Sequence, residues 1–203
     1  MNANPWLLMG GKMKKKKDRK LTPEEKEEKR IKKMRKRGKS DFVEVRGSEI
    51  HGRGVYCIEP IEKEQYFIEY VGNLIDKEES ERRAWAQFEE HEKTGAAAVY
   101  IFNLTKKWDL DGNVEWNPAR LINHSCEPNS EAIQDGKRIY LQALRDIEVD
   151  EEITFDYGFD VECYEDHPCR CGSSKCIGYI VGRDYHDELK RLLAAKKKQE
   201  KAP

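Results

Sequence analysis

Three closely spaced cysteines carry the strongest chemical signal in this sequence. Residues 169–176 read CRCGSSKC, which places three thiols on a short loop rich in Gly and Ser. Thiolates are favoured zinc ligands, and a structural zinc site needs four ligands in a tetrahedron. One ligand must therefore come from elsewhere in the chain, and the sequence leaves four candidates open: Cys57, Cys126, Cys163 and His167.

A second group of chemically capable residues lies at 120–129, which read RLINHSCEPN. Asn, His and Ser side chains are rarely grouped between apolar residues unless each has a hydrogen-bond partner or a chemical role. A turn with one well-bonded histidine is the alternative explanation. The density of polar groups favours a binding or catalytic site.

Two further segments are informative only in combination with the first two. Residues 151–158, EEITFDYG, predict a strand that ends near a tyrosine, and residues 51–56, HGRGVY, hold two glycines that let the backbone approach a ligand closely. Taken alone, the first segment is more typical of an edge strand with a core aromatic. The G-x-G pattern alone is weak evidence, because no phosphate-binding motif continues from it.

The elements that must position these groups are mostly short strands, with one helix among the strands and a second helix at the C-terminus. Alternating or β-forming residues predict strands at 42–46, 55–58, 66–74, 98–104 and 131–144, the last interrupted by a hairpin turn at Asp135-Gly136. A C-terminal helix is expected from Tyr185 to about Lys198, with Leu189, Leu192 and Leu193 on one side.

One helix interrupts the strands. Asp76, followed three residues later by Glu79, matches a capping box and marks its beginning. Trp85 and Phe88 share one face of this helix, and Gly95 can end it.

Charge is strongly segregated along the 203 residues, although the net charge is only −1. Residues 1–40 hold 16 Lys and Arg against 5 Asp and Glu, residues 41–185 hold 16 against 31, and residues 186–203 hold 6 against 3. The basic arm, residues 1–40, lacks apolar periodicity, so it is expected to be disordered or to form a solvated helix after Thr22-Pro23. A nucleic-acid contact or nuclear-import segment and a solubilising tail are both compatible with it.

The longest apolar run, residues 96–102, is too short to span a bilayer, and the N-terminus lacks the pattern of a signal peptide. The chain is therefore expected to be intracellular, without membrane association: in the nucleus or on chromatin in a eukaryote, or in the cytoplasm of a bacterium. In a reducing compartment the six cysteines are expected to be metal ligands or free thiols. Cys57 is expected to be buried and Cys163 exposed.

In this order the segments HGRGVYC, EYVG, YIF, RLINHSCEPN, EEITFDY and CRCGSSKC resemble the motifs of the SET-domain family of protein lysine methyltransferases with a post-SET zinc motif. The likeness is greatest to trithorax-type histone methyltransferases and runs from about Phe42 to Gly182. It implies a mostly β fold of small curved sheets with a knot-like active site, a short inserted helix, a post-SET zinc loop and a C-terminal helix. The implied units are the basic arm at 1–40, a SET catalytic domain at 41–160, a post-SET zinc-binding segment at 161–182, and a C-terminal helix with a basic tail at 183–203.

The resemblance also implies a role for individual residues. Tyr157 would orient the reacting amine, with Tyr100 and Phe155 beside it in an aromatic channel. Cys126 would be the fourth ligand of one structural Zn²⁺, beside Cys169, Cys171 and Cys176. S-adenosylmethionine would be bound by His51, Gly52, Arg53, Gly54, Tyr100, Asn123, His124 and Arg170.

The function expected from this resemblance is S-adenosylmethionine-dependent methylation of lysine in a basic, histone-like protein tail. Phe155 carries no phenol hydroxyl, so di- and trimethyl-lysine are expected to be accessible. The alternative is a noncatalytic SET scaffold that binds DNA or chromatin through its basic arm. In a variant of the first hypothesis, the enzyme needs activating subunits near the helix that carries Trp85 and Phe88.

Overall fold

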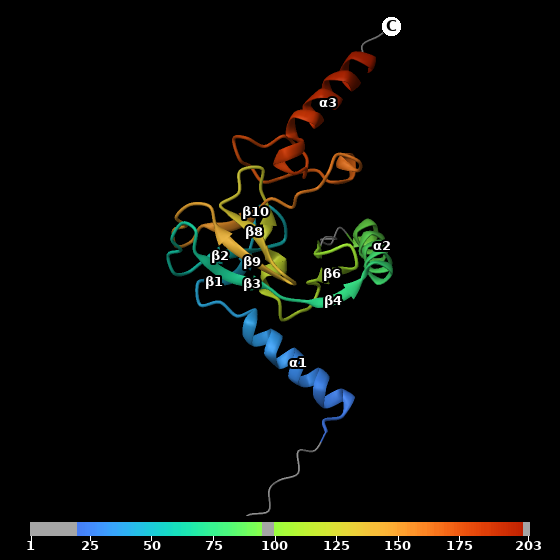
Figure 1. The fold of residues 1–203 in the computed structure, drawn as a ribbon. Coiled ribbons are helices and arrows are strands. Elements are labelled where there is room, and N and C mark those ends of the chain that lie inside the picture. Colours follow the sequence, from blue (N-terminus) through green and yellow to red (C-terminus); the bar gives the residue numbers. More distant parts are fainter. Residues whose placement is uncertain (1–19, 95–99, 201–203) are drawn as a thin grey trace, which may run out of the picture.

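The computed structural model describes residues 20–94 and 100–200, and most of their regular structure is short strands in two curled sheets (Figure 1). The larger sheet has the order β1-β2-β10-β8-β9-β3, and β7 pairs with β10 beside this path. Its strands are β1 (Val43–Gly47), β2 (Arg53–Cys57), β3 (Tyr66–Tyr70), β7 (Asn123–His124), β8 (Ser130–Asp135), β9 (Arg138–Ala143) and β10 (Glu152–Phe155). The smaller sheet has the order β4-β6-β5, from β4 (Asn73–Asp76), β5 (Ile101–Asn103) and β6 (Trp108–Asp111).

Three α-helices lie outside the sheets: α1 (Pro23–Arg37), α2 (Lys77–Thr94) and α3 (His186–Glu200). Short 3₁₀ turns occupy Pro118–Leu121, Tyr164–Asp166 and Arg183–Tyr185. In Figure 1, α1 and α3 lie at opposite ends of the molecule, and α2 flanks the smaller sheet. The core between these elements is built from buried aliphatic and aromatic side chains, among them Val55, Ile122, Leu141, Ile147 and Ile153.

The strand predicted at residues 66–74 is two strands, β3 and β4, which belong to different sheets. Val71 and Gly72 between them are buried, and a Cβ atom on Gly72 would overlap the carbonyl of Asp111. The backbones of the two sheets therefore meet at this glycine. Strand β6 was not predicted, because its two aspartates are uncommon in strands. Both are buried and paired, Asp109 with Lys77 and Asp111 with Arg83.

The predicted hairpin in residues 131–144 is confirmed as β8–β9. Asp135 pairs with Arg138, so the two loop residues are Gly136 and Lys137, one position later than the predicted turn. Gly136 has φ +59°, a left-handed conformation that glycine adopts without strain. The strands predicted at 42–46 and 55–58 correspond to β1 and β2. Of the strand predicted at 98–104, residues 98 and 99 lie outside the described residues, and β5 covers 101–103.

Helix α2 begins where the sequence predicts. The carboxylate of Asp76 accepts a hydrogen bond from the backbone N–H of Glu79 at 2.9 Å. The side chain of Glu79 binds Arg82 and Arg83 and does not complete a capping box. The predicted end at Gly95 lies outside the described residues.

The apolar faces of α2 and α3 are only partly covered. The rings of Trp85 and Phe88 meet edge to face with centroids 6.2 Å apart, and Trp85 is 68% exposed. In α3, Leu189 is fully buried and Leu193 half-buried, whereas Leu192 is exposed.

Of the two alternatives expected for the basic arm, the structure has the helix after Thr22-Pro23. It covers Pro23–Arg37 and begins at a capping box between Thr22 and Glu25. Residues 1–19 lie outside the described part of the chain. Most of the helix is exposed, but Met34 is only 7% exposed, so one side of the helix is packed against the sheet.

A buried carboxylate anchors the C-terminal end of α1. Glu69 in β3 accepts hydrogen bonds from Arg37 of α1 and from Arg138 at the start of β9. Burial by itself raises the pKa of Glu69, but the hydrogen bonds from Arg138 and Arg37 outweigh it, and the net pKa is lowered. One carboxylate therefore connects α1 to two strands of the larger sheet.

We expect Arg37→Ala to lower the free energy of unfolding at pH 7 by about 1–3 kcal/mol, because Glu69 loses one of its two charged partners. Since the pKa of Glu69 is lowered by folding, this contribution is complete above about pH 4.3 and is lost as the pH falls through the folded-state value. Urea denaturation at neutral and acidic pH measures it. Arg35→Ala is the matched control: Arg35 is exposed and unpaired among the described residues, so a change within about 0.5 kcal/mol is expected. Equal losses in the two variants, or a loss that persists in acid, would contradict the role of Glu69.

Candidate active site and metal centre

The site forms where β7 lies parallel to β10. Asn123 pairs with Thr154 and His124 with Phe155, so two segments separated by about 30 residues in the sequence run side by side. Tyr157 follows two residues after the end of β10. Two of the polar segments recognised in the sequence are thus joined by backbone pairing.

The side chain of Asn123 connects this pair of strands to the glycine-containing loop. Its amide lies 3.1 Å from the carbonyl oxygen of Arg53, 3.1 Å from the hydroxyl of Ser48, and 2.7 Å from a carboxylate oxygen of Glu152. Gly54 is buried, and a Cβ atom there would overlap the same carboxylate. The amide and the glycine together keep the loop close to β10.

Glu152 was given no role by the sequence analysis, although it lies in one of the quoted motifs. Its carboxylate also accepts hydrogen bonds from the hydroxyl groups of Ser48 and Tyr56, at 2.8 and 3.0 Å. Its partners come from β2 and the loop before it, about 100 residues away in the sequence, so no local pattern indicated them. The three other residues of the predicted cofactor loop, His51, Gly52 and Arg53, are exposed, and Gly52 has φ +48°.

Tyr157 forms part of the wall of a cavity of about 480 Å³. Its hydroxyl donates a hydrogen bond to the carbonyl oxygen of Ile122 at 3.0 Å. Its ring lies 4.9 Å from that of Phe155 and 5.8 Å from that of Phe159, measured between centroids. Burial raises the pKa of Tyr157 well above its ordinary value, so the hydroxyl is protonated at neutral pH and acts as a donor.

Other parts of the cavity wall come from β3, β5 and the residue before β5. Tyr100 is nearly buried, and its carbonyl oxygen accepts a hydrogen bond from the hydroxyl of Tyr70 at 3.0 Å. Phe102 stacks on Phe155 with centroids 5.9 Å apart. Tyr70, Phe102 and Phe159 were not among the predicted site residues. The first two lie within quoted motifs, whereas the surroundings of Phe159 offered no signal.

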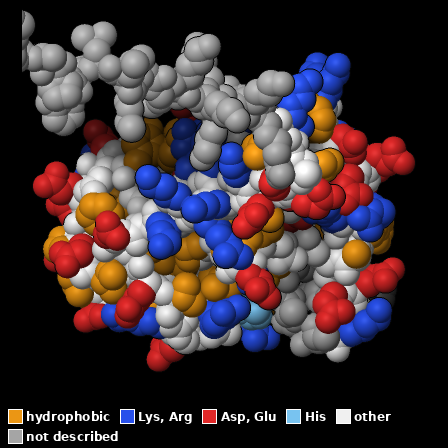
Figure 2. All heavy atoms as spheres, turned by 90° about the horizontal axis from the view of Figure 1, so that it is seen from below, with side chains coloured by type: hydrophobic (Ala, Val, Ile, Leu, Met, Phe, Trp, Pro, Cys, Tyr) orange, Lys and Arg blue, Asp and Glu red, His pale blue; other side chains and the backbone are white. Residues whose placement is uncertain are grey.

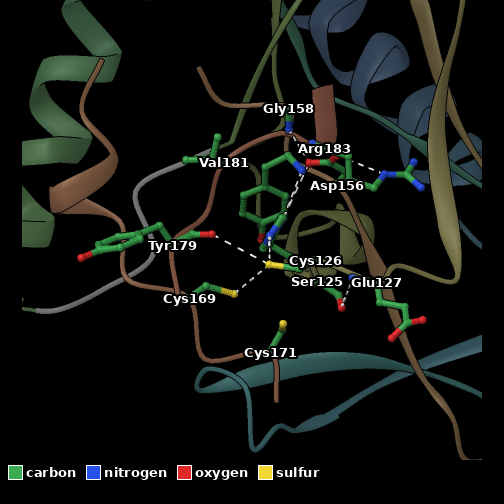
Figure 3. A network of polar contacts seen from close by, with 12 residues as sticks. Ser125, Cys126, Glu127, Asp156, Gly158, Cys169, Cys171, Tyr179, Val181 and Arg183 are labelled. Atoms are coloured by element: carbon green, nitrogen blue, oxygen red, sulfur yellow. Dashed lines mark hydrogen bonds and ion pairs between the residues drawn. The ribbon is translucent and has the colours of Figure 1, made fainter. Parts of the chain in front are cut away.

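The four cysteines predicted as ligands lie together, and Figure 3 shows three of them, Cys126, Cys169 and Cys171. Their sulfur atoms are all within 4.8 Å of one another, and Cys126 Sγ lies 3.8 Å from that of Cys169 and 4.0 Å from that of Cys176. A tetrahedral zinc ion with bonds of about 2.3 Å requires sulfur separations of ~3.8 Å, so the cluster fits such an ion. The donor set is therefore able to hold a metal ion.

The other three candidates for the fourth ligand lie elsewhere. Cys57, the last residue of β2, is buried in the core, as expected, and Cys163 is exposed where it lines the cavity, also as expected. His167 packs against Phe159 with ring centroids 5.1 Å apart. Arg170, a predicted cofactor contact, lies exposed in the loop between two of the cysteines.

His124 stands between the cysteine cluster and the cavity. Its Nε2 lies 3.7 Å from Cys126 Sγ, and its Nδ1 accepts a hydrogen bond from the backbone N–H of Tyr157 at 3.3 Å. Burial lowers the pKa of His124 to about 4, despite the opposing effect of Asp156, so the ring is neutral at pH 7 and can accept this bond. Asp156 in turn accepts from the backbone N–H of Arg183 at 2.8 Å, which ties the C-terminal segment to the end of β10 (Figure 3).

Comparison with known proteins assigns this chain to a family. Residues 52–158, more than half of the chain, match the family model described as the SET domain. The chain belongs to the SET-domain family, whose fold of curled sheets with a few helices the structure has.

Its relatives include proteins named as histone methyltransferases. Histone-lysine N-methyltransferase trithorax of Drosophila virilis is 40% identical over 144 residues, which are 69% of this chain and 4% of the fly protein. The H3 lysine-4 specific histone-lysine N-methyltransferase of Candida albicans is 37% identical over 139 residues, 66% of this chain and 13% of the yeast protein. That of Aspergillus oryzae is 37% identical over 157 residues, 74% of this chain and 12% of the fungal protein. The chain therefore spans only a small part of the length of these relatives.

No helix in residues 20–94 or 100–200 is sufficiently long and apolar to cross a membrane.

We expect the purified protein to contain about one metal ion per chain and Cys126→Ser to lose it, because the remaining three thiols leave the tetrahedron incomplete. Elemental analysis measures the metal content, and thermal unfolding should show a lower Tm for the variant. Cys163→Ser, outside the cluster, should match the wild type in both measurements. If Cys126→Ser does not fold, the less buried Cys171→Ser replaces it. Retention of the full metal content by the cluster variant would rule out Cys126 as a ligand.

Proposed function

We propose that this chain is an S-adenosylmethionine-dependent protein lysine N-methyltransferase that acts on a basic, histone-like tail. The observation that carries the proposal is the position of the Tyr157 hydroxyl, which lies in an aromatic cavity directly beside the pairing of Asn123 and His124 with β10. Membership of the SET-domain family and the names of the relatives support the same chemistry.

The residues around the glycine-containing loop fit a bound S-adenosylmethionine, which would supply an electrophilic methyl group. Gly52 has a left-handed backbone with open space around it, and the amide of Asn123 holds this loop against β10. Main-chain groups of the loop are thus accessible to a polar ligand. The residues proposed to bind the cofactor are His51, Gly52, Arg53, Gly54, Tyr100, Asn123, His124 and Arg170.

The chemical task of the protein is to present a neutral amine. A lysine side chain has an ordinary pKa of about 10.4 and cannot act as a nucleophile while protonated. The aromatic cavity removes water from the amine, which lowers its pKa and aligns it for displacement. Tyr157, protonated and fixed to the Ile122 carbonyl, orients the amine and does not act as a strong base.

We propose zinc as the ion of the four-cysteine cluster, with a structural role. The cluster joins Cys126, two residues after His124, to the loop of Cys169–Cys176. A bound ion would hold the C-terminal segment against the active site. All four positions are filled by thiols, so the ion has no open position for substrate.

A basic substrate agrees with the charge of the catalytic body. Residues 41–185 carry 31 acidic against 16 basic side chains, and such a field accelerates the encounter with a Lys-rich peptide. The relatives' names point to histone H3 and hence to a nuclear or chromatin site in a eukaryotic host, with the cytoplasm in a bacterial one.

Two further partners remain proposals. Exposed Trp85 and half-buried Phe88 on α2 offer an apolar surface for an activating subunit. The basic arm offers a contact for DNA, and this observation favours the second candidate function, a noncatalytic SET scaffold on chromatin. A noncatalytic scaffold would not need a tyrosine hydroxyl in the cavity. The position of Tyr157 therefore favours the methyltransferase over the scaffold.

We expect Tyr157→Phe to lower kcat by at least about 10²-fold while the affinity for S-adenosylmethionine changes little, since only the positioning hydroxyl is removed. Transfer of a labelled methyl group to mixed histones measures turnover, and calorimetry measures cofactor binding. Tyr185→Phe, an exposed tyrosine outside the cavity, should retain the wild-type rate. A Tyr157→Phe enzyme of near wild-type rate would exclude the proposed role. Wild-type binding of cofactor without transfer to any histone would favour the scaffold or a requirement for the subunit.

We expect Phe155→Tyr to shift the product toward monomethyl-lysine. The added hydroxyl lies in the cavity wall beside Tyr157 and Phe102, where it can hydrogen-bond the amine and leaves less room for a methylated amine to rotate. Mass spectrometry of a methylated peptide measures the degree of methylation. If the unmutated enzyme makes only monomethyl-lysine, the proposal for Phe155 is wrong.

A further inference from the structure

One face of the molecule carries a concentration of basic side chains that the proposed chemistry does not use. Residues 30–39 hold seven Lys and Arg and no Asp or Glu. At 100° per residue, Lys32 and Lys36 lie on the side of α1 opposite the buried Met34. Figure 2, which looks onto the α1 side, shows Lys and Arg side chains gathered in the middle of this face, with Asp and Glu mainly toward its edges. We call the following residues the basic face: Lys32, Lys33, Arg35, Lys36 and Lys39 of α1 and its end, and Lys106, Lys107 and Lys137 of two hairpin turns.

The helix holds its lysines in a defined position relative to the sheet. Arg37 binds the buried Glu69, and Arg30 donates a hydrogen bond to Asn73 of β4 at 2.9 Å. Gly38, directly after the helix, is buried against Val71 so closely that a Cβ atom would overlap it. The basic half of α1 is therefore a fixed part of the folded surface.

The lysines of the two turns join the same surface. Arg138, which shares Glu69 with α1, follows Lys137 of the β8–β9 turn. The ammonium group of Lys137 lies 5.1 Å from the ring centroid of Trp108, which follows Lys106 and Lys107 in the β5–β6 turn. The side chain of Gln134 also donates to the carbonyl of Leu104 at 2.9 Å, which connects the two hairpins directly.

The charges of the basic face are not neutralised internally. Among the described residues, none of its eight side chains forms an ion pair. Lysines elsewhere mostly do: Lys63 pairs with Glu64, Lys175 with Glu127, and Lys190 with Asp187. An external anion can therefore gain the full interaction with this face.

The residue types of the basic face indicate which class of anion it binds. Protein–protein interfaces are depleted in Lys, whereas Lys contacts to phosphates dominate sequence-independent binding of DNA. Seven of the eight side chains are Lys, and they are spread over a helix and two turns. We infer that the basic face binds the phosphate backbone of duplex DNA. This inference deepens the DNA contact proposed for the basic arm: it assigns the contact to a folded surface that includes the sheet.

Binding of full-length protein to a labelled duplex of about 20 base pairs, titrated over a range of salt concentrations, tests the inference. Two triple variants remove three charges each: Lys32→Ala, Lys33→Ala, Lys36→Ala in the helix, and Lys106→Ala, Lys107→Ala, Lys137→Ala in the turns. We expect each to weaken binding at least about tenfold at 0.1 M salt and to reduce the slope of log K against log salt by up to about 2.7, or ~0.9 per lost phosphate contact. The sequence of the duplex should have little effect, because phosphate contacts do not read bases.

The matched control removes the same charge from α3, at the other end of the molecule (Figure 1), by Lys190→Ala, Lys197→Ala, Lys198→Ala. It should bind DNA within about twofold of wild type, since the binding face is unchanged. A tail variant replaces Lys12 and Lys14–Lys17 by Ala. Unchanged binding by either triple variant, with loss only in the tail variant, would overturn the assignment to a folded face.

Two further measurements distinguish DNA binding from binding of an acidic protein and from the proposed methyltransferase activity. Stronger binding of poly-glutamate than of the duplex would overturn DNA as the partner in favour of an acidic protein. Methylation of free histone peptides should be the same in all these variants, because none of the substituted residues lines the cavity. Absence of methylation by every protein, wild type included, would count against the proposed function, as described above for the wild type, and would leave the DNA result standing.

Discussion

The parallel pairing of β7 with β10 is the constraint on which the site depends. This contact is only two residue pairs long, yet it sets Asn123 beside Thr154 and His124 beside Phe155. The amide of Asn123 then donates a hydrogen bond to the glycine-containing loop, and His124 accepts a hydrogen bond from the backbone N–H of Tyr157. Cys126, two residues further on, lies beside Cys169 of the cysteine loop. A shift of one residue would turn each of these side chains to the opposite side, so the positions of the glycine-containing loop, Tyr157 and the four-cysteine cluster all depend on one register.

Burial determines the protonation states of the polar groups around this pairing. The neutral imidazole of His124 can accept a hydrogen bond because burial lowers its pKa, and the hydroxyl of Tyr157 remains a donor because burial raises its own. Both effects have the same origin, the cost of placing a charge in an environment of low polarity. The same environment favours a neutral lysine over a charged one. A neutral amine is the form that the proposed methyl transfer would require.

Charge outside the cavity is unequally distributed over the molecule. Residues 41–185 carry 31 acidic against 16 basic side chains, whereas α1, which precedes them, is basic over its last turn. A free basic segment would be attracted to the acidic body. The anchoring of α1 through Arg37 and Glu69 holds its basic half on the sheet and leaves the lysines turned outward.

The sequence by itself determined the family, the hairpin, the start of α2 and the three clustered cysteines, because these depend on local spacing and on motifs. Residue types could not decide among the four candidates for the fourth ligand, since only the fold brings Cys126 within 4 Å of Cys169. The contacts of Glu152, of Phe159 and of the anchored side of α1 could likewise not be predicted from residue types. Their partners are distant in the sequence, and contacts of that kind arise from tertiary packing and leave no local pattern. The tertiary structure alone therefore decided which polar groups meet, how they are protonated, and which charges remain free for a partner.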